Sequence, residues 1–307
     1  MSDILLPIRR ALVDFDYNEL ESTRLFHGRG HCYPSLEFVN VDWFSPVIWM
    51  VVYGEVPTDL LDSLKQQVLD VAATNHCIQA VCFQQRGRGK SEQEILYGKL
   101  PESLMAHELG ANYPIDLALN QNIGFFLDAK PARQWVRAQA KGQRILNMFA
   151  YTCSFSVAAL QGGAEHVVNI DMAKGPIAQG QKNHALNGFK NDKVSFLPHD
   201  VFRSMKNLAK RGPYDIIVID PPSRQKNSFD ANKDYLKLLK KLTPLMHEST
   251  QVVALLNAPY LNHNFLPGIF SEALPRYQLS ERLAQRGDFP EKDLNCCLKM
   301  QIFNRSE

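Results

Sequence analysis

The sequence predicts an α/β protein with a doubly wound sheet of about seven strands, preceded by a smaller mixed α+β domain. The main observation is a series of short, almost wholly apolar runs in the second half of the chain, which is typical of parallel strands buried on both faces. Helical segments separate these runs, which favours a largely parallel sheet with a ligand site at the carboxyl ends of its strands. The runs are residues 145–149, 167–170, 194–197, 214–219 and 252–256.

The first two runs and the segment between them predict a βαβ unit. Residues 145–149 form the first strand, residues 150–156 are mostly small, and the apolar helical segment that follows ends at Gly162. The second strand ends at Asp171. In a right-handed βαβ unit, residues 151–154 and Asp171 lie around one crevice outside the carboxyl ends of the strands.

The acidic residue at the end of the second strand suits a ribose, because a carboxylate can accept hydrogen bonds from both ribose hydroxyls. The turn lacks the GxGxxG pattern that brings a pyrophosphate close to backbone N–H groups, which argues against NAD. S-adenosylmethionine carries an adenosine without phosphate, so it fits a turn with fewer glycines. The alternative is an ordinary α/β core turn with Asp171 at the buried edge of the sheet.

The composition is that of a globular protein of one to three domains, with 45% hydrophobic and 21% charged residues among 307. The formal net charge of +2 is close to neutral, so any contact with nucleic acid must come from local basic patches. No run approaches the ~20 apolar residues of a membrane span, and we expect a cytoplasmic protein without a membrane partner. The six cysteines show no CxxC spacing, so we expect reduced thiols and no structural metal.

Residues 1–118 predict the smaller domain, which we expect to bind RNA or another substrate. The pattern changes to the α/β repeat near Pro114, so we place the second domain over residues 119–307. We also expect a hairpin around residues 95–100. The other predicted elements of the smaller domain are strands at 36–41, 47–53 and 78–83 and a helix at 58–72.

A basic, glycine-rich loop follows the last of these strands. Its Arg86, Arg88 and Lys90 are candidate contacts for RNA phosphates, and its glycines keep the backbone open to the ligand. A solvated surface turn is the alternative, because most charge runs are only that.

The third strand of the α/β repeat leads to Asp200 and Val201, which are candidate contacts for adenine. The carboxylate or a backbone edge would meet the 6-amino group, and Val201 would lie against the ring. The alternative for Asp200 is a helix N-cap, which is compatible with binding.

The fourth strand runs directly into Asp220, Pro221, Pro222 and Ser223. Two prolines after a central strand fix the backbone and turn the chain out of the sheet. Asp220 and the Pro221 carbonyl could then accept hydrogen bonds from the amino group of a base and align a ring nitrogen with a methyl group. A strand terminator with a capping aspartate is the alternative.

Six motifs carry a resemblance to a known family: GFFLDAKPAR (124–133), LNMFAYTCSFSVAAL (146–160), VNIDMAK (168–174), NHALNG (183–188), HDVF (199–202) and DPPS (220–223). With them the chain resembles the class I S-adenosylmethionine-dependent methyltransferases. It looks most like the bacterial 23S ribosomal RNA methyltransferases, first the 7-methylguanine-forming half of the fused bifunctional enzyme and next the 5-methylcytosine-forming branch.

The resemblance implies a Rossmann-like class I methyltransferase sheet, S-adenosyl-L-methionine as cofactor and four groups of site residues. The first lines the cofactor entrance, the second holds the methionine part, the third holds ribose and adenine, and the fourth is the catalytic group facing the target base. The entrance residues are Phe126, Asp128, Lys130 and Arg133, and the residues at the methionine part are Phe149, Tyr151, Thr152, Cys153 and Ser154. The residues at ribose and adenine are Asp171, Met172, Asp200 and Val201, and the catalytic residues are Asp220, Pro221 and Pro222.

Three features depart from the family pattern. Cys153 stands where the family commonly has glycine, so a positive φ there would cost on the order of 1 kcal/mol and weaken cofactor binding. Lys130 replaces the usual arginine and loses a planar, bidentate donor. We expect the protein to lack the RNA-binding module that often precedes this region, so residues 20–118 or a partner would dock the substrate.

The target chemistry can also be narrowed. Carbon methylation of cytosine needs a cysteine thiolate that adds to the ring, and the family places it just after the fourth or fifth strand, where this chain has DPPSR and LLNAPY. We therefore expect direct attack by a base nitrogen of ribosomal RNA on the sulfonium methyl, a step that needs alignment and desolvation more than a base. The alternatives are a methyltransferase for a protein or small molecule, or an inactive cofactor-binding homologue.

Overall fold

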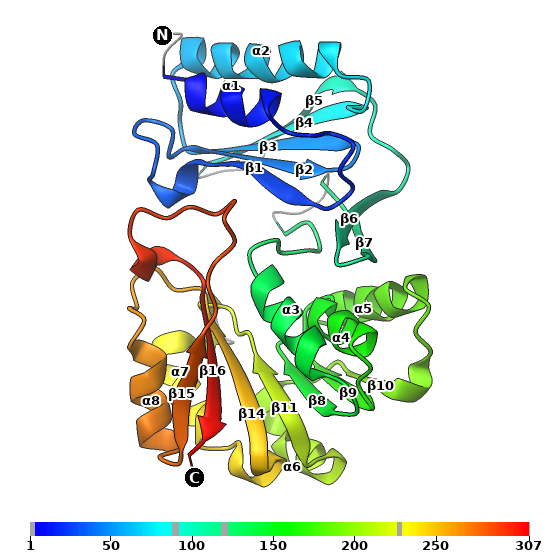
Figure 1. Cartoon of the computed structure of the whole chain (residues 1–307), viewed down its shortest axis with the longest axis vertical. Coiled ribbons are helices and arrows are strands. Elements are labelled where there is room, and N and C mark those ends of the chain that lie inside the picture. Colours follow the sequence, from blue (N-terminus) through cyan, green and yellow to red (C-terminus); the bar gives the residue numbers. More distant parts are fainter. Residues whose placement is uncertain (1–3, 88–91, 118–121, 226–228, 307) are drawn as a thin grey trace. The chain divides into compact units, whose positions relative to one another are not determined.

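The computed structural model describes residues 4–87, 92–117, 122–225 and 229–306 (Figure 1). Contacts divide the chain into two compact units. The first contains Met1–Leu127 and Arg286–Leu294, and the second contains Asp128–Gln285 and Asn295–Glu307. The predicted domain boundary, between residues 118 and 119, lies outside the described residues.

The first unit is built on a five-stranded mixed sheet with the order β1-β2-β3-β4-β5. Strands β3 and β4 are parallel, and the other neighbours are antiparallel. Helix α2 connects β3 to β4, as a parallel pair requires. The strands are β1 (Thr23–His27), β2 (Val39–Phe44), β3 (Val47–Tyr53), β4 (Ala80–Arg86) and β5 (Glu92–Gly98).

Helices α1 (Leu6–Val13) and α2 (Thr58–Thr74) cover one face of this sheet (Figure 1). Their apolar positions pack on alternate strand residues such as Val41, Met50 and Val81, so the helical and strand periods of the sequence meet in one core.

A separate hairpin follows the sheet, formed by β6 (Leu104–Glu108) and β7 (Ala111–Ile115). The sequence also predicts a hairpin around residues 95–100. Most of these residues belong to β5, which pairs antiparallel with β4.

Residues Arg286–Leu294 belong to the first unit through contacts with β1 and the turn after it. Asp288 Oδ2 accepts hydrogen bonds from Thr23 Oγ1 at 2.7 Å and from the Arg24 N–H at 3.0 Å. The Lys292 N–H donates to the Gly30 carbonyl at 2.8 Å. The chain therefore leaves the second unit after Gln285 and returns to it at Asn295.

The second unit contains a seven-stranded sheet with the order β10-β9-β8-β11-β14-β16-β15. The first five strands in this order are parallel, and β16 runs antiparallel to both of its neighbours. The predicted sheet of about seven strands is therefore confirmed. The strands are β8 (Arg144–Met148), β9 (His166–Ile170), β10 (Val194–Leu197), β11 (Tyr214–Ile219), β14 (Met246–Leu256), β15 (Tyr277–Arg282) and β16 (Lys299–Arg305).

The strand order reverses between β8 and β11. From β8 the chain builds outward through β9 and β10, then it returns to the other side of β8 and builds outward through β11 and β14. The carboxyl ends of β8 and β11 therefore form a topological switch point, where open α/β sheets bind ligands.

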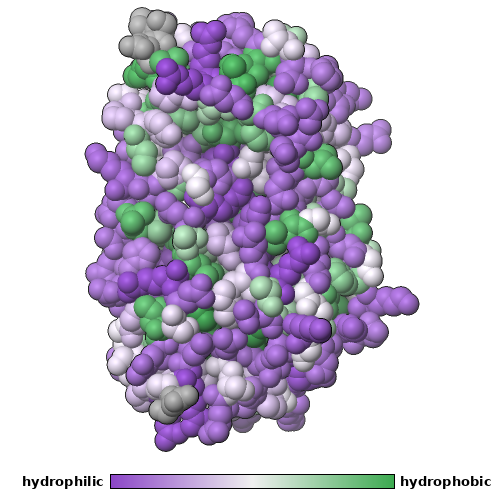
Figure 2. All heavy atoms as spheres, in the orientation of Figure 1, coloured by the Kyte–Doolittle hydropathy of each residue, from purple (hydrophilic) through white to green (hydrophobic). Residues whose placement is uncertain are grey.

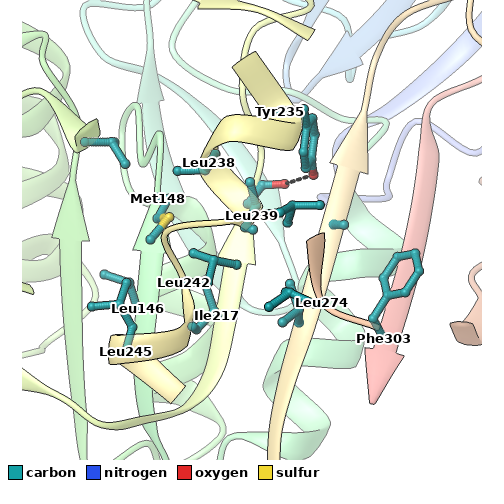
Figure 3. Close-up of a cluster of buried hydrophobic side chains, with 14 of the residues drawn as sticks. Leu146, Met148, Ile217, Tyr235, Leu238, Leu239, Leu242, Leu245, Leu274 and Phe303 are labelled. Atoms are coloured by element: carbon teal, nitrogen blue, oxygen red, sulfur yellow. Dashed lines mark hydrogen bonds between the residues drawn. The ribbon is translucent and has the colours of Figure 1, made fainter. Parts of the chain in front are cut away.

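Helices cover both faces of this sheet (Figure 1). Helices α3 and α4 pack on one face with strand residues such as Ile145, and α6, α7 and α8 pack on the other with residues such as Leu146, Met148 and Ile217 (Figure 3). Adjacent strand residues thus enter opposite cores, which explains the unbroken apolar runs of the sequence. The helices are α3 (Lys130–Gln139), α4 (Ser154–Gln161), α5 (Lys174–Leu186), α6 (Val201–Arg211), α7 (Ala231–Leu239) and α8 (Phe265–Ala273).

Short elements complete the two units. A two-residue antiparallel pair, β12 (Arg224–Gln225) and β13 (Phe229–Asp230), precedes α7. The 3-10 turns are η1 (Gly28–Gly30), η2 (Asn191–Lys193), η3 (Thr243–Leu245) and η4 (Leu294–Cys296).

Few large apolar side chains are exposed, and the surface in Figure 2 shows only small hydrophobic patches among hydrophilic residues. Two of the exposed side chains, Met172 and Tyr260, lie beside the site described below. None of the helices within the described ranges combines the length and the apolar character needed to cross a bilayer.

Candidate functional site

The turn between β8 and α4 contains three non-glycine residues in the left-handed region. The φ angle is 58° at Phe149, 47° at Tyr151 and 64° at Cys153. This region costs a residue with a Cβ roughly 1–2 kcal/mol. Strain of this kind clusters at functional sites, and here it lies at the switch point of the sheet.

Cys153 fits into this turn because Gly180 of α5, which lies against it, has no side chain. The thiol is fully buried, and a Cβ built on Gly180 would lie 2.5 Å from Cys153 Sγ and 3.0 Å from its Cβ. Burial raises the pKa of the Cys153 thiol well above its usual range, and the Asp171 carboxylate raises it further. The side chain is therefore a neutral packing group and not a nucleophile.

A chain of buried polar side chains lies beneath the same turn. Asn147 Nδ2 donates to Asn169 Oδ1 at 2.9 Å, and Asn169 Nδ2 donates to Ser156 Oγ at 3.0 Å. Ser156 Oγ lies 2.8 Å from His184 Nε2, and His184 Nδ1 lies 2.7 Å from the Gly180 carbonyl. The chain ties β8, β9 and α4 to α5.

The donor and the acceptor of each hydrogen bond follow from the group at the end of this polar chain, the Gly180 carbonyl. The Gly180 carbonyl can only accept, so His184 Nδ1 carries the proton. Desolvation lowers the pKa of His184, so the ring is neutral, its Nε2 accepts, and Ser156 donates to it. At the opposite end, Asn147 Oδ1 is buried and has no hydrogen-bond partner among the described residues.

Asp171 links the turn to the end of β9. Its Oδ2 accepts from the Tyr151 N–H at 2.9 Å and its Oδ1 accepts from the Ala173 N–H at 2.8 Å. A carboxylate offers about four lone-pair directions, so each oxygen keeps capacity for a further donor. The group therefore has the capacity that a ribose diol requires.

Helix α4 begins at Ser154 directly after the turn. Within the described structure, no side chain caps its first turn, so the positive end of the helix dipole is available to an anion. Next to Asp171, Met172 is 50% exposed and can cover a flat ring. Thr152 is buried, and its carbonyl accepts from Asn183 Nδ2 at 2.9 Å.

Asp200 lies at the carboxyl end of β10 and caps α6. Its Oδ1 accepts from the Arg203 N–H at 2.9 Å, so the helix N-cap is confirmed. Val201 follows as a buried residue. The contact of both residues with adenine stays a prediction.

Asp220 follows β11 at the other side of the switch point. The residue is half-buried, yet its carboxyl is desolvated, and this raises the pKa of Asp220 to about 7. The Asp128 carboxylate raises it further, and the guanidinium of Arg133, itself 1% exposed, opposes the rise. The structure thus brings three predicted site residues into one electrostatic group.

Tyr235 of α7 lies beside the ends of β11 and β14 (Figure 3). Its hydroxyl is fully buried and lies 3.4 Å from the Ile219 carbonyl and 3.2 Å from the Leu255 carbonyl, so it bridges the ends of β11 and β14. Burial raises the pKa of Tyr235 well above its usual range, and Asp220 adds to the rise. Tyr235 therefore acts as a neutral donor that fixes the two strand ends.

Other predicted site residues lie in the first unit. Phe126 is 46% exposed, and Arg86 is half-buried at the end of β4. Arg88 and Lys90 lie outside the described residues. In the second unit, Lys130 is the first residue of α3.

These residues fit S-adenosylmethionine better than a dinucleotide. The exposed ends of β8, β9 and β10 offer an uncapped helix start, a carboxylate with spare acceptor capacity and an apolar cover. Together they suit a carboxylate, a ribose and a flat base without a pyrophosphate. Within the described ranges, no group of three or more metal-binding side chains is placed to hold a metal ion.

A family model decides the assignment. The model of the S-adenosylmethionine-dependent methyltransferases matches residues 23–304. The chain belongs to this family. S-adenosylmethionine is therefore the cofactor of this methyltransferase, and when bound it supplies a methyl group activated by a sulfonium.

The methyltransferase is similar to two curated relatives. It is 28% identical over 289 residues to the Bacillus subtilis (strain 168) protein named "Putative ribosomal RNA large subunit methyltransferase YwbD", covering 90% of this chain and 72% of that protein. It is 35% identical over 177 residues to "Ribosomal RNA large subunit methyltransferase K/L" of Shewanella baltica (strain OS155 / ATCC BAA-1091). That match covers 55% of this chain and 24% of the K/L protein, so the chain spans about a quarter of that relative.

Solved structures share the fold. The crystal structure of SMU.776 complexed with SAH has a TM-score of 0.85 at 24% identity, covering 98% of this chain and 80% of that one. "The complex structure of aTrm5 and tRNALeu" has a TM-score of 0.60 at 14% identity, covering 87% of this chain and 72% of that one.

Sequence reasoning missed the residues that support the site from inside. Asn147 and Asn169 interrupt apolar strands, and a buried amide in a central strand is a usable signal that a polar partner is near. Tyr235 and His184 gave no such signal, because an apolar helix position and a helical histidine are common.

Proposed function

We propose that this methyltransferase transfers a methyl group to a base nitrogen of large-subunit ribosomal RNA. The observation that carries the proposal is Asp220, a desolvated acid followed by two prolines at the switch point of the sheet. The names of two relatives support RNA as the substrate. A cytoplasmic location, where ribosomes are assembled, belongs to the same proposal.

The site suits alignment of a flat nitrogen nucleophile. Pro221 is buried and Pro222 half-buried, so the backbone after Asp220 is rigid and its carbonyls are fixed. A carboxylate here accepts a hydrogen bond from an exocyclic amino group and stabilises the positive charge that a methylated ring nitrogen acquires. Guanine N7 carries no proton, so methyl transfer to that atom requires no separate base.

A second candidate is carbon methylation, and one contact favours it. Cys296 Sγ lies 4.0 Å from the Pro259 carbonyl, so a thiol comes beside the loop that follows β14. A thiol there could add to a pyrimidine ring before methyl transfer. Cys296 is half-buried, unlike the fully buried Cys153.

The first unit supplies a candidate RNA contact. The Arg86 guanidinium lies 5.4 Å from the Trp49 ring centroid and 5.7 Å from that of Tyr53, and Arg29 lies 4.4 Å from the Tyr53 centroid. Two guanidinium groups around one ring combine phosphate-binding charge with a stacking surface. Arg86 with Arg88 and Lys90 therefore remains the proposed RNA-binding group.

The test is transfer of labelled methyl to ribosomal RNA from a strain that lacks the protein, followed by nucleoside mass spectrometry. We expect one methylated purine, loss of activity in Asp220→Ala and full activity in Cys296→Ser. A methylated pyrimidine that disappears in Cys296→Ser would favour the second candidate. Labelling of protein but not RNA would overturn both.

A further inference from the structure

The loop after β14, residues 257–263, is anchored to the start of β16. Lys299 is fully buried, and its Nζ donates to the Ala258 carbonyl at 2.9 Å and to the Asn295 carbonyl. A buried ammonium requires such acceptors, so this lysine ties the loop and the segment before β16 to one point.

The far end of the same loop is held as well. The His263 carbonyl accepts from Gln301 Nε2 at 2.8 Å, and the His263 N–H lies 3.4 Å from Asn295 Oδ1. The His263 ring contacts Cys297 Sγ at 3.8 Å. The loop therefore has fixed ends around its middle residue, Tyr260.

Tyr260 presents its ring outward from this fixed loop. The side chain is 59% exposed, although a tyrosine has ample apolar surface to bury. Its hydroxyl lies 3.4 Å from the carbonyl of Ser223, the last residue of the segment that begins at Asp220. The two loops are neighbours because β11 and β14 pair in parallel, with Ile219 opposite Ala254.

We infer that Tyr260 forms one wall of the acceptor site and stacks on the RNA base that is methylated. The inference rests on the proposed function and adds the residue that holds the base against the Asp220–Ser223 segment. An exposed aromatic ring on a rigid loop is the feature that proteins use to hold an unstacked base.

Loss of the Tyr260 ring should raise the KM for RNA. Base–aromatic stacking contributes ~1–3 kcal/mol per base, which corresponds to a ~5- to 150-fold change in KM for RNA. Stacking needs the π face and not the hydroxyl, so Tyr260→Phe should differ from wild type by ~2-fold at most. The cofactor affinity should not change, because the ring is assigned to the acceptor.

The experiment measures methyl transfer to ribosomal RNA by wild type, Tyr260→Ala, Tyr260→Leu and Tyr260→Phe, with S-adenosylmethionine affinity measured by calorimetry. Leu186→Ala is the matched control, because Leu186 is 46% exposed on α5. We expect a raised KM for RNA in the Ala and Leu variants, with the Phe variant and the control close to wild type.

Each other outcome contradicts the inference in a distinct way. Activity of Tyr260→Ala equal to wild type would overturn the stacking role and leave the proposed function standing. Loss of activity in Tyr260→Phe would assign the role to the hydroxyl and its contact with Ser223. A wild-type protein that transfers no methyl to RNA would overturn the proposed function and this inference together.

Discussion

The packing of Cys153 against Gly180 makes a prediction that can be measured in one thermodynamic cycle. The left-handed turn places the thiol where a Cβ on Gly180 would lie, at 2.5 Å from Sγ. Without the Cys153 side chain, the nearest remaining atom is the Thr152 carbonyl carbon at 3.4 Å, an ordinary contact. The effect of Gly180→Ala should therefore change sign between the two backgrounds.

The magnitude follows from known substitutions. In wild type, Gly180→Ala forces an overpacked core and should destabilise the protein by ~1–3 kcal/mol. In Cys153→Gly the clash is gone, and alanine within helix α5 should stabilise it by ~1 kcal/mol over glycine. The coupling between the two positions should therefore be ~2–4 kcal/mol.

The assay is urea unfolding of wild type, both single variants and the double variant, followed by circular dichroism. Gly175→Ala is a matched control in the same helix, because a Cβ there meets nothing within 4 Å. It should have the same effect in both backgrounds. Additive effects of Cys153→Gly and Gly180→Ala would refute the reasoning.

Three further predictions concern charged and polar groups of the site. Asp171→Asn should weaken S-adenosylmethionine binding ~10- to 100-fold, since charged hydrogen bonds to ribose are lost; unchanged affinity by calorimetry would contradict this role. The pKa of Asp220 is raised to about 7 from the usual aspartate value of 3.8, so between these two pH values the folded state binds more protons than the unfolded state. The free energy of unfolding should therefore fall as the pH rises through this window, and that of Asp220→Asn should not. The same pH dependence in both proteins would show that the carboxyl is not desolvated. Burial lowers the pKa of His184, so the stability that the neutral ring contributes should be lost as the pH falls below the usual value of 6.5. The free energy of unfolding of His184→Ala should be ~2–3 kcal/mol lower than that of wild type at pH 8, and it should lack this pH dependence. Equal stability of His184→Ala and wild type would show that the buried polar chain does not stabilise the fold.

Much of the second unit could be predicted because its strands are buried on both faces and their runs are unmistakable. The ends of β9, β10 and β11 were placed for the same reason, and Asp171, Asp200 and Asp220 follow them in the structure.

Other features depend on contacts between distant segments and leave little local pattern. The β6–β7 hairpin alternates buried and half-buried residues over only five positions per strand, and no strand is predicted for it from the sequence. Residues Arg286–Leu294 join the first unit through Asp288 and Lys292, and their sequence is that of an ordinary loop. Lys299 lies among strand residues, and only the fold shows that carbonyl groups surround its Nζ.

The most direct test of the account is calorimetry of S-adenosylmethionine binding to the wild-type chain and to Asp171→Ala. We expect one binding site in wild type and a strong loss of affinity in the variant, because Asp171, whose hydrogen bonds join the left-handed turn to the end of β9, is the proposed ribose acceptor. Absence of binding heat in wild type, or equal affinities in both proteins, would contradict it.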